Sequence, residues 1–295
     1  MIQQHGNGRG HRVDKQARAR TKLPRPENLR GDECLKDLPT VNMLWIGTEL
    51  GRLEQLSLAS FLAAGHEVRL HVYDTVRNVP QAIRLADASD LMPFETAQAL
   101  KHRKTASFAL ASDYFRFMLQ KQSLGLWADS DVVCLSPIAT EDPVLFGWES
   151  EDYINGAVLY IAAGNPLVDA TLAAFAERII PPWVPARKAL PFHIKRWFGG
   201  SFGPADLPRG TYGPKCLTAL AKDHDLLPLA KPTDVFYPLH PRQARRIFEP
   251  GTSVEQIITE NSLTIHLWNE KLGALKKANP PSSSAIAALI RRFGV

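Results

Sequence analysis

The sequence of 295 residues contains little cysteine and no long apolar run. Its three cysteines, Cys34, Cys134 and Cys216, lie far apart without a metal-binding spacing, which excludes a disulfide framework and indicates a reducing compartment. No apolar run reaches the roughly 18 residues that a membrane-spanning helix needs. The N-terminus has no apolar core, so we expect no secretory signal and a cytoplasmic protein.

The overall composition is that of a globular protein, and its positive charge is confined to the two ends. Hydrophobic residues make up 45% and charged residues 22%, which excludes wholesale disorder and a fibrous repeat. Lys and Arg outnumber Asp and Glu by nine to five in residues 1–40 and by five to none in residues 271–295. Residues 41–270 hold 21 basic and 25 acidic side chains, so the net charge of +5 does not indicate a nucleic-acid partner.

Charge and proline content divide the chain into three parts. We expect a basic, mobile leader at 1–40, a single folded domain at 41–270, and a basic linker with a short amphipathic tail at 271–295. The tail fits either a solvated segment or contact with an anionic inner-membrane surface. Within the domain, six prolines and five Lys/Arg predict a long loop at 181–210, which would serve as an acceptor-binding or lid loop or be a tolerated surface insertion.

Apolar patterns predict an α/β fold for the domain. A buried strand at 41–47, a helix at 53–64 and a strand at 66–73 form a strand–helix–strand unit, whose crossover makes the two strands parallel. Further segments alternate in the same way, with helices at 107–120, 167–179 and 215–221 and strands at 125–128, 132–135, 144–148, 155–161 and 264–268. The order predicts a mainly parallel central sheet flanked by helices.

Two carboxylates, Asp129 and Asp131, follow the apolar strand at 125–128. If the backbone stays extended their side chains diverge, and if it turns both can reach one divalent cation such as Mg²⁺ or Mn²⁺. Ligands gather at the carboxyl ends of strands in open α/β sheets, which favours a site here. Asp223 and Asp225 have the same spacing but follow a helix in a polar turn, so we expect them to be solvated.

Other polar residues in apolar surroundings leave two interpretations open. Asp113 and Arg116 stand three residues apart on one face of a helix. They either form a local ion pair or point at the same ligand as Asp129 and Asp131. His266, inside an apolar strand, is either a hydrogen-bonded core residue or a metal ligand. Trp45, in the first strand, is by default a core side chain.

Taken in order, these motifs resemble the glycosyltransferases with a DXD-containing sugar-binding region, known as glycosyltransferase family 32. The resemblance spans residues 41–270, and its pieces are 44–47, 53–55 with Ser57, 111–116, 125–131, 154–157, 213–214 and 266–269. The family usually has another glycine after Gly47, where this chain has Thr48. That difference affects the loop over the base and leaves the carboxylates untouched.

The resemblance implies a glycosyltransferase-A type fold, which is Rossmann-like and mainly parallel, and the activity of a hexosyltransferase. It implies retaining, metal-dependent transfer from a nucleotide-diphosphate donor, with a UDP-sugar expected and Mn²⁺ or Mg²⁺ as cofactor. The acceptor would be a glycan, glycolipid or lipid-linked molecule in surface polysaccharide or lipopolysaccharide biosynthesis. Peripheral contact with the inner membrane face would go through the basic termini.

The resemblance also implies residue roles on the nucleotide side. Trp45 would stack on the nucleobase, and the backbone near Ile46 and Gly47 would contact the edge of the base. Trp268 would lie close to the donor, with Asn269 nearby as a further candidate.

On the sugar and diphosphate side the implied roles belong to charged and amide side chains. Asp113 would accept hydrogen bonds from sugar hydroxyls, and Arg116 would bind the sugar or the diphosphate. Asn155 would face the sugar. Asp129 would contact ribose and metal, so that the catalytic set comprises Asp113, Arg116, Asp129 and Asp131. The metal ligands would be Asp129, Asp131 and His266.

Two alternatives to this function remain open. A toxin-like protein O-glycosyltransferase shares the tryptophan, the Asp/Arg pair and the Asp-x-Asp pair, although the short chain shows no delivery domain. A catalytically inactive sugar-nucleotide-binding protein is the other, and the intact set of polar residues argues against it.

Overall fold

Strands and helices alternate along the computed structural model, which describes residues 38–176 and 179–295. Nearly all of the leader predicted at 1–40, Cys34 included, lies outside the described residues. The strands are β1 (Val41–Trp45), β2 (Val68–Val72), β3 (Arg84–Asp87), β4 (Leu126–Ala128), β5 (Val132–Cys134), β6 (Val144–Trp148), β7 (Ile154–Ile161) and β8 (Thr264–His266). The α-helices are α1 (Arg52–Ala63), α2 (Phe94–Ala99), α3 (Ala109–Lys121), α4 (Pro166–Ala176), α5 (Ala186–Trp197), α6 (Pro214–Asp223), α7 (Thr233–Phe236), α8 (Asn269–Leu272) and α9 (Ala285–Phe293). Short 3₁₀ helices are η2 (Ala88–Asp90), η3 (Pro204–Asp206), η4 (Leu227–Leu229), η5 (Pro241–Phe248), η6 (Val254–Gln256) and η7 (Gly273–Lys277).

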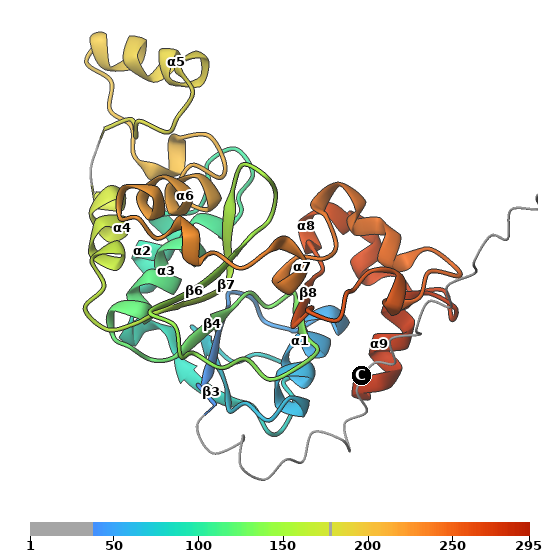
Figure 1. The fold of residues 1–295 in the computed structure, drawn as a ribbon. Helices are drawn as coiled ribbons and strands as arrows, with labels where there is room; N and C mark the ends of the chain where they lie inside the picture. Colours follow the sequence, from blue (N-terminus) through green and yellow to red (C-terminus); the bar gives the residue numbers. More distant parts are fainter. Residues whose placement is uncertain (1–37, 177–178) are drawn as a thin grey trace, which may run out of the picture.

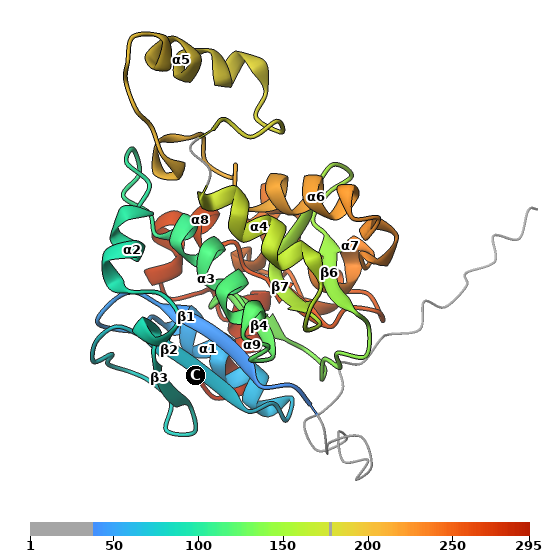
Figure 2. The ribbon, with the colours of Figure 1, turned by 90° about the vertical axis from the view of Figure 1, so that its left-hand side faces the viewer.

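Six strands form the central sheet in the order β3-β2-β1-β4-β7-β6 (Figure 1). The first four are parallel to one another, whereas β7 runs antiparallel to both β4 and β6. β5 and β8 form a separate antiparallel pair. Helices lie on both faces of the sheet (Figure 2). The predicted α/β class with a mainly parallel central sheet is therefore confirmed.

The two faces of β1 explain why the sheet is covered on both sides. Met43 packs into an apolar cluster with Phe61 of α1, and Leu44 packs into a different cluster with Phe115 of α3. Successive side chains of a strand point to opposite faces, so an apolar run such as that of β1 requires a helix on each side. This burial fixes the strand ends from which the polar residues project.

Helix α9 belongs to the packed body, in contrast to the amphipathic tail predicted at 271–295. Ser284 caps its first turn by accepting the Ala287 N–H, and Ile286 and Leu289 are fully buried in a cluster with Leu56 of α1. The apolar face of α9 is therefore not available to a lipid surface, which corrects that expectation for the C-terminal segment. Among the described residues, each helix is too short or too polar to cross a bilayer.

Helix α5 lies within the segment 181–210, for which the sequence predicts a long loop. Prolines are strong loop signals, but Pro185 only precedes the first turn and Pro191 is accommodated inside the helix. The chain enters and leaves α5 at the same end of the molecule, where the helix stands apart from the sheet and its flanking helices (Figures 1 and 2).

Candidate functional site

A tight turn after β4 carries both carboxylates of the Asp-x-Asp pair. The Val132 N–H donates a hydrogen bond to the Asp129 carbonyl at 3.0 Å, which closes the turn. β5 then pairs antiparallel with β8, so that Val132 lies opposite His266. Of the two backbone possibilities for the pair, the structure has the turn, and Asp129, Asp131 and His266 come together at the ends of three strands.

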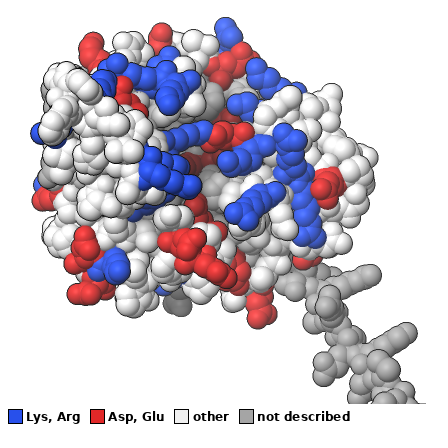
Figure 3. Space-filling model, turned by 90° about the horizontal axis from the view of Figure 1, so that it is seen from above, with Lys and Arg blue, Asp and Glu red and all other residues white. Residues whose placement is uncertain are grey.

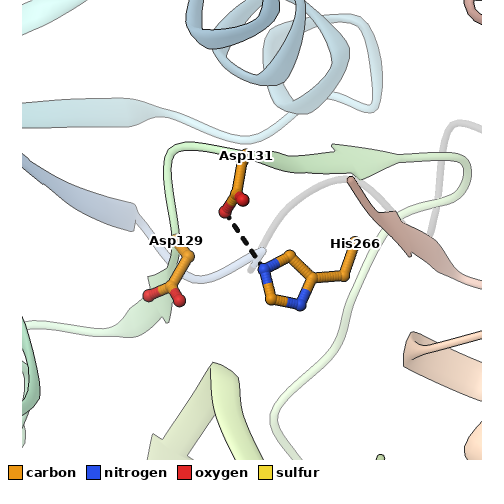
Figure 4. A group of neighbouring side chains, drawn as sticks. All are labelled: Asp129, Asp131 and His266. Carbon is orange, nitrogen blue, oxygen red and sulfur yellow. Dashed lines mark hydrogen bonds and ion pairs between the residues drawn. The ribbon is translucent and has the colours of Figure 1, made fainter. Parts of the chain in front are cut away.

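These three side chains form a possible cation site (Figure 4). His266 Nε2 lies 3.1 Å from Asp131 Oδ1, and the other Asp131 oxygen accepts the Asn269 N–H at 2.8 Å. One ligand atom from each of Asp129, Asp131 and His266 lies within 4.8 Å of the others. His266 Nδ1 is buried without a hydrogen-bond partner among the described residues. Two carboxylates and an imidazole fit a divalent cation such as Mn²⁺ or Mg²⁺.

The pKa shifts of Asp131 and His266 show that positive charge is favoured beside the Asp131 carboxylate. Burial alone would raise the pKa of Asp131, but the charge of His266 and the hydrogen bonds from His266 and Asn269 outweigh it, so the pKa is lowered. Burial would likewise lower the pKa of His266, and the Asp131 charge and hydrogen bond raise it above its ordinary value instead. A divalent cation would supply the positive charge that the imidazolium provides.

Arg116 connects Asp129 to a second carboxylate. Its Nη2 lies 3.0 Å from Asp129 Oδ1 and 3.2 Å from Asp113 Oδ1, and its side chain is only 8% exposed. The guanidinium lies 5.2 Å from the centre of the Trp127 ring, and the Trp127 indole N–H donates to Asp129 Oδ1 at 2.8 Å. Asp113 and Arg116 therefore form the local ion pair that was one of the two interpretations, and this pair reaches the Asp-x-Asp turn. A role of the two side chains toward a bound ligand stays a prediction.

Two glycines lie against Asp113 and Arg116, where a larger residue would crowd these side chains. A Cβ at Gly213, just before α6, would lie 3.0 Å from Asp113 Oδ2, and a Cβ at Gly156 in β7 would lie 3.2 Å from Arg116 Nη1. The backbone therefore approaches both charged side chains closely and holds them in place. The resulting burial raises the pKa of Asp113 to about 6, although the Arg116 charge acts in the opposite direction.

Asn155 lies at the start of β7 and is held by three hydrogen bonds. Its Oδ1 accepts the Ala157 N–H at 2.7 Å, its Nδ2 donates to Glu149 at 2.6 Å, and its carbonyl accepts the Tyr237 hydroxyl at 3.0 Å. The side chain is oriented by these contacts and lines the cavity that Asp113 also lines. A role toward the sugar stays a prediction.

Aromatic side chains lie on the other side of the carboxylates. Trp45 ends β1, and its indole Nε1 is buried without a hydrogen-bond partner in the described structure. The backbone of Gly47 faces this ring, because a Cβ there would lie 3.0 Å from Nε1. The Trp268 ring lies 3.9 Å from the His266 ring, centre to centre, and its indole N–H donates to the Leu239 carbonyl at 2.7 Å.

Two neighbouring cavities share five lining residues, and Asp129 and Arg209 are the charged ones among them. The smaller, of about 240 Å³, brings together three predicted residues: Asp113, Arg116 and Asn155. The larger, of about 510 Å³, brings together five more: Trp45, Asp131, His266, Trp268 and Asn269. Ile46 and Gly47 are not lining residues of either cavity. The predicted residues thus surround one divided site, with the Asp-x-Asp turn at the division.

Several charged residues of this site were not predicted from the sequence. Arg209 lines both cavities and pairs with Glu270 at the start of α8. Lys271 and Lys276 line the larger cavity, together with Glu54, whose burial raises its pKa. Arg209 was visible only as one basic residue in a proline-rich segment, and the lysines stand in the part predicted to be a linker. Their approach to the site depends on tertiary structure.

Comparison with known proteins gives the enzyme class. Residues 226–293 match the family model of the alpha 1,4-glycosyltransferase conserved region. The chain is a glycosyltransferase. The matched segment is under a quarter of the chain and carries His266 and Trp268, whereas the Asp-x-Asp pair lies outside it. Membership of glycosyltransferase family 32 stays a prediction.

Further comparisons concern curated sequences and solved structures. No curated protein matches the sequence. Among solved structures, the PaToxG glycosyltransferase is similar at 14% sequence identity and a TM-score of 0.41, over 65% of this chain and 70% of that chain. The six-stranded, mainly parallel sheet flanked by helices belongs to the α/β class, and its assignment to the glycosyltransferase-A type stays a prediction.

Proposed function

We propose that this glycosyltransferase transfers a sugar from a nucleotide-diphosphate donor, with a UDP-sugar expected, to a glycan or glycolipid acceptor. Transfer would retain the anomeric configuration and require Mn²⁺ or Mg²⁺. The enzyme would act in the cytoplasm, in the synthesis of surface polysaccharide or lipopolysaccharide. The observation that carries the proposal is the cluster of Asp129, Asp131 and His266 in the aromatic cavity, with Asp129 also lining the adjoining cavity that Asp113 and Arg116 line.

The divided cavity suits the two halves of a nucleotide sugar. The larger part contains Trp45, whose flat apolar face can stack on a base. The smaller part contains Asp113 and Asn155, which offer oxygen atoms to sugar hydroxyls. A diphosphate between them would lie beside Asp129 and Arg209, where a cation and a guanidinium can bind its oxygens.

The charges of the site suit a reaction in which the leaving group gains negative charge. When bound by the Asp-x-Asp turn and His266, a divalent cation would stabilise that charge. Arg116 is already oriented by Asp113 and Asp129, so its guanidinium needs little reorganisation as charge develops. Stabilisation that grows toward the transition state is what accelerates the reaction.

Retention through a same-face route fits the placement of the carboxylates. Asp113 and Asp129 line the smaller cavity, and both are engaged by Arg116, which disfavours nucleophilic attack by either on the anomeric carbon. The leaving phosphate would then accept the proton of the acceptor hydroxyl as the new glycosidic bond forms on the same face. A glycosyl–enzyme adduct trapped on Asp113 would overturn this route.

Donor hydrolysis tests the proposed function. Purified wild-type chain is incubated with Mn²⁺ and the nucleotide sugar that gives the largest rise in melting temperature in a screen, since a ligand of the native state stabilises it. The Asp131→Asn variant should hydrolyse the donor at least about 100-fold more slowly. Asp225→Asn is the matched control, because Asp223 and Asp225 have the same spacing and are both exposed, at the end of α6 and just after it. Equal rates for wild type and Asp131→Asn would exclude the proposed metal-dependent transfer at this site.

A further inference from the structure

Helix α5 has one side toward its own supporting segments and one side toward solvent. Ala189 is its only buried residue among the described ones, and the partly buried Phe192 packs on Phe202 with ring centres 5.4 Å apart. The rest of the helix stands clear of the sheet and its helices (Figures 1 and 2). Two anchor points therefore orient α5 and leave its opposite side uncovered.

That uncovered side is a continuous apolar stripe. Leu190, Ile194 and Trp197 are spaced by four and three residues, which puts them on one side of a helix, and Phe198 follows directly. Trp197 is 87% and Phe198 82% exposed. These four side chains are half of the eight large apolar ones exposed in the described chain, so the exposure is concentrated here and not scattered.

The charge around the stripe has a single sign. Residues 179–205 contain no aspartate or glutamate. Three basic residues of α5, Arg187, Lys188 and Lys195, are exposed beside the stripe. At a protein–protein interface, charged residues are rare in the core, and those at the rim are paired with opposite charges. A helix that lies on a membrane surface instead combines aromatic and aliphatic side chains with Lys and Arg.

We propose that α5 docks on an anionic lipid bilayer, with its apolar stripe at the boundary between headgroups and acyl chains. Trp197 and Phe198 would occupy the depth at which aromatic side chains concentrate in membranes. The basic residues would lie at the level of the anionic headgroups, where each Lys or Arg is attracted to the surface potential. The charge complementarity of an acid-free segment with an anionic surface selects this occupant over a neutral one.

Docking through α5 would bring the donor site to the membrane. The chain that leaves α5 runs through Pro204, Arg209 and Tyr212, which line the smaller cavity. Viewed from the end that bears α5, basic side chains border a hollow in the surface (Figure 3). This step rests on the proposed function: the acceptor is a lipid-linked molecule that is presented to this cavity from the bilayer surface.

Vesicle sedimentation tests the docking with the full chain. The probes are vesicles of phosphatidylcholine alone and of phosphatidylcholine with one third phosphatidylglycerol. Wild type should sediment with the anionic vesicles and much less with the neutral ones, and high salt should weaken the binding. The double variant Trp197→Ser/Phe198→Ser should bind at least about ten-fold more weakly. Leu85→Ser/Leu229→Ser, which removes exposed apolar side chains elsewhere, should bind like wild type.

The outcomes separate docking from catalysis. Failure of wild type to bind anionic vesicles, or equal binding by the Trp197→Ser/Phe198→Ser variant, overturns the docking. Donor hydrolysis without vesicles should be unchanged in this variant, which shows that its fold and donor site are intact. Asp131→Asn should lose hydrolysis and keep vesicle binding. Vesicle binding by a wild type that hydrolyses no donor would support docking while excluding the proposed function.

Discussion

Arg116 and Trp197 represent two regions of the molecule with opposite construction. The Arg116 side chain is 8% exposed and contacts two carboxylates and an indole ring, whereas Trp197 is 87% exposed on a helix that stands apart. The first region lies at the ends of buried strands, where packing fixes each polar atom. The second is joined to the body by a few contacts. Reaction chemistry requires fixed geometry, and docking on an extended surface requires reach and exposed area.

The sharpest test of this contrast compares a buried ion pair with an exposed one. Arg116→Gln leaves Asp113 and Asp129 near each other without the cation between them, so the free energy of unfolding should fall by about 3 kcal/mol or more. Donor hydrolysis should fall at least about 100-fold. Urea unfolding monitored by circular dichroism measures the first effect.

The control for Arg116 is Arg103, which pairs with Asp206 at 3.0 Å but is 72% exposed. Arg103→Gln should change the free energy of unfolding by about 1 kcal/mol or less. Similar losses in the two variants would show that burial does not distinguish the regions.

Acid should destabilise the sheet through His71. This residue of β2 is buried against Asn42, with Nε2 3.0 Å from the amide oxygen, and burial followed by the Arg69 charge lowers its pKa from 6.5 to about 4. As pH falls below about 6.5 the unfolded chain takes up a proton that the folded chain does not, so stability decreases until pH about 4. Between pH 7 and pH 5 this contribution is about 2 kcal/mol.

Replacement of His71 isolates that contribution. The His71→Gln variant should lose about 2 kcal/mol less than wild type between the two pH values in urea unfolding. His193→Gln, on the exposed α5, should behave like wild type. A pH dependence that is unchanged in His71→Gln would contradict the assignment.

A smaller effect is expected from a single methyl group beside the sugar cavity. Gly213→Ala would place its Cβ 3.0 Å from the Asp113 carboxylate, so Asp113 must shift and donor hydrolysis should fall about ten-fold. Mn²⁺ binding should be retained, since Asp131 and His266 do not contact Gly213. Gly203→Ala, with open space around its Cβ, should keep wild-type hydrolysis. Equal hydrolysis by both variants would show that the position of Asp113 is not critical.

The buried region was largely predictable from the sequence because burial leaves a pattern. The apolar run of β1, the helical spacing of α1 and the aspartates after β4 each predicted their element, and the structure confirms the parallel β1–β2 unit. Whether the Asp-x-Asp backbone turns could not be predicted, because that depends on the pairing of β5 with β8 from 130 residues further along the chain. β3 and α2 were missed, since most of their side chains are exposed and carry no apolar periodicity.

The appended region was predicted less well because one pattern fits two environments. The amphipathic residues of α9 suit a lipid surface or a protein core equally, and only the structure shows them packed on α1. For α5, the prolines led to the prediction of a loop, although Leu190, Ile194 and Trp197 have helical spacing. The pairing of Arg209 with Glu270 joins residues 61 positions apart, which one sequence does not reveal.

Calorimetric titration of Mn²⁺ tests the central claim, that Asp129, Asp131 and His266 hold a divalent cation beside the diphosphate. The titration uses wild type, Asp131→Asn and Asp225→Asn, each with the nucleoside diphosphate of the selected donor present. Wild type and Asp225→Asn should bind one equivalent of Mn²⁺ with equal affinity, and Asp131→Asn should bind at least about ten-fold more weakly. Equal binding by Asp131→Asn and wild type would contradict the claim.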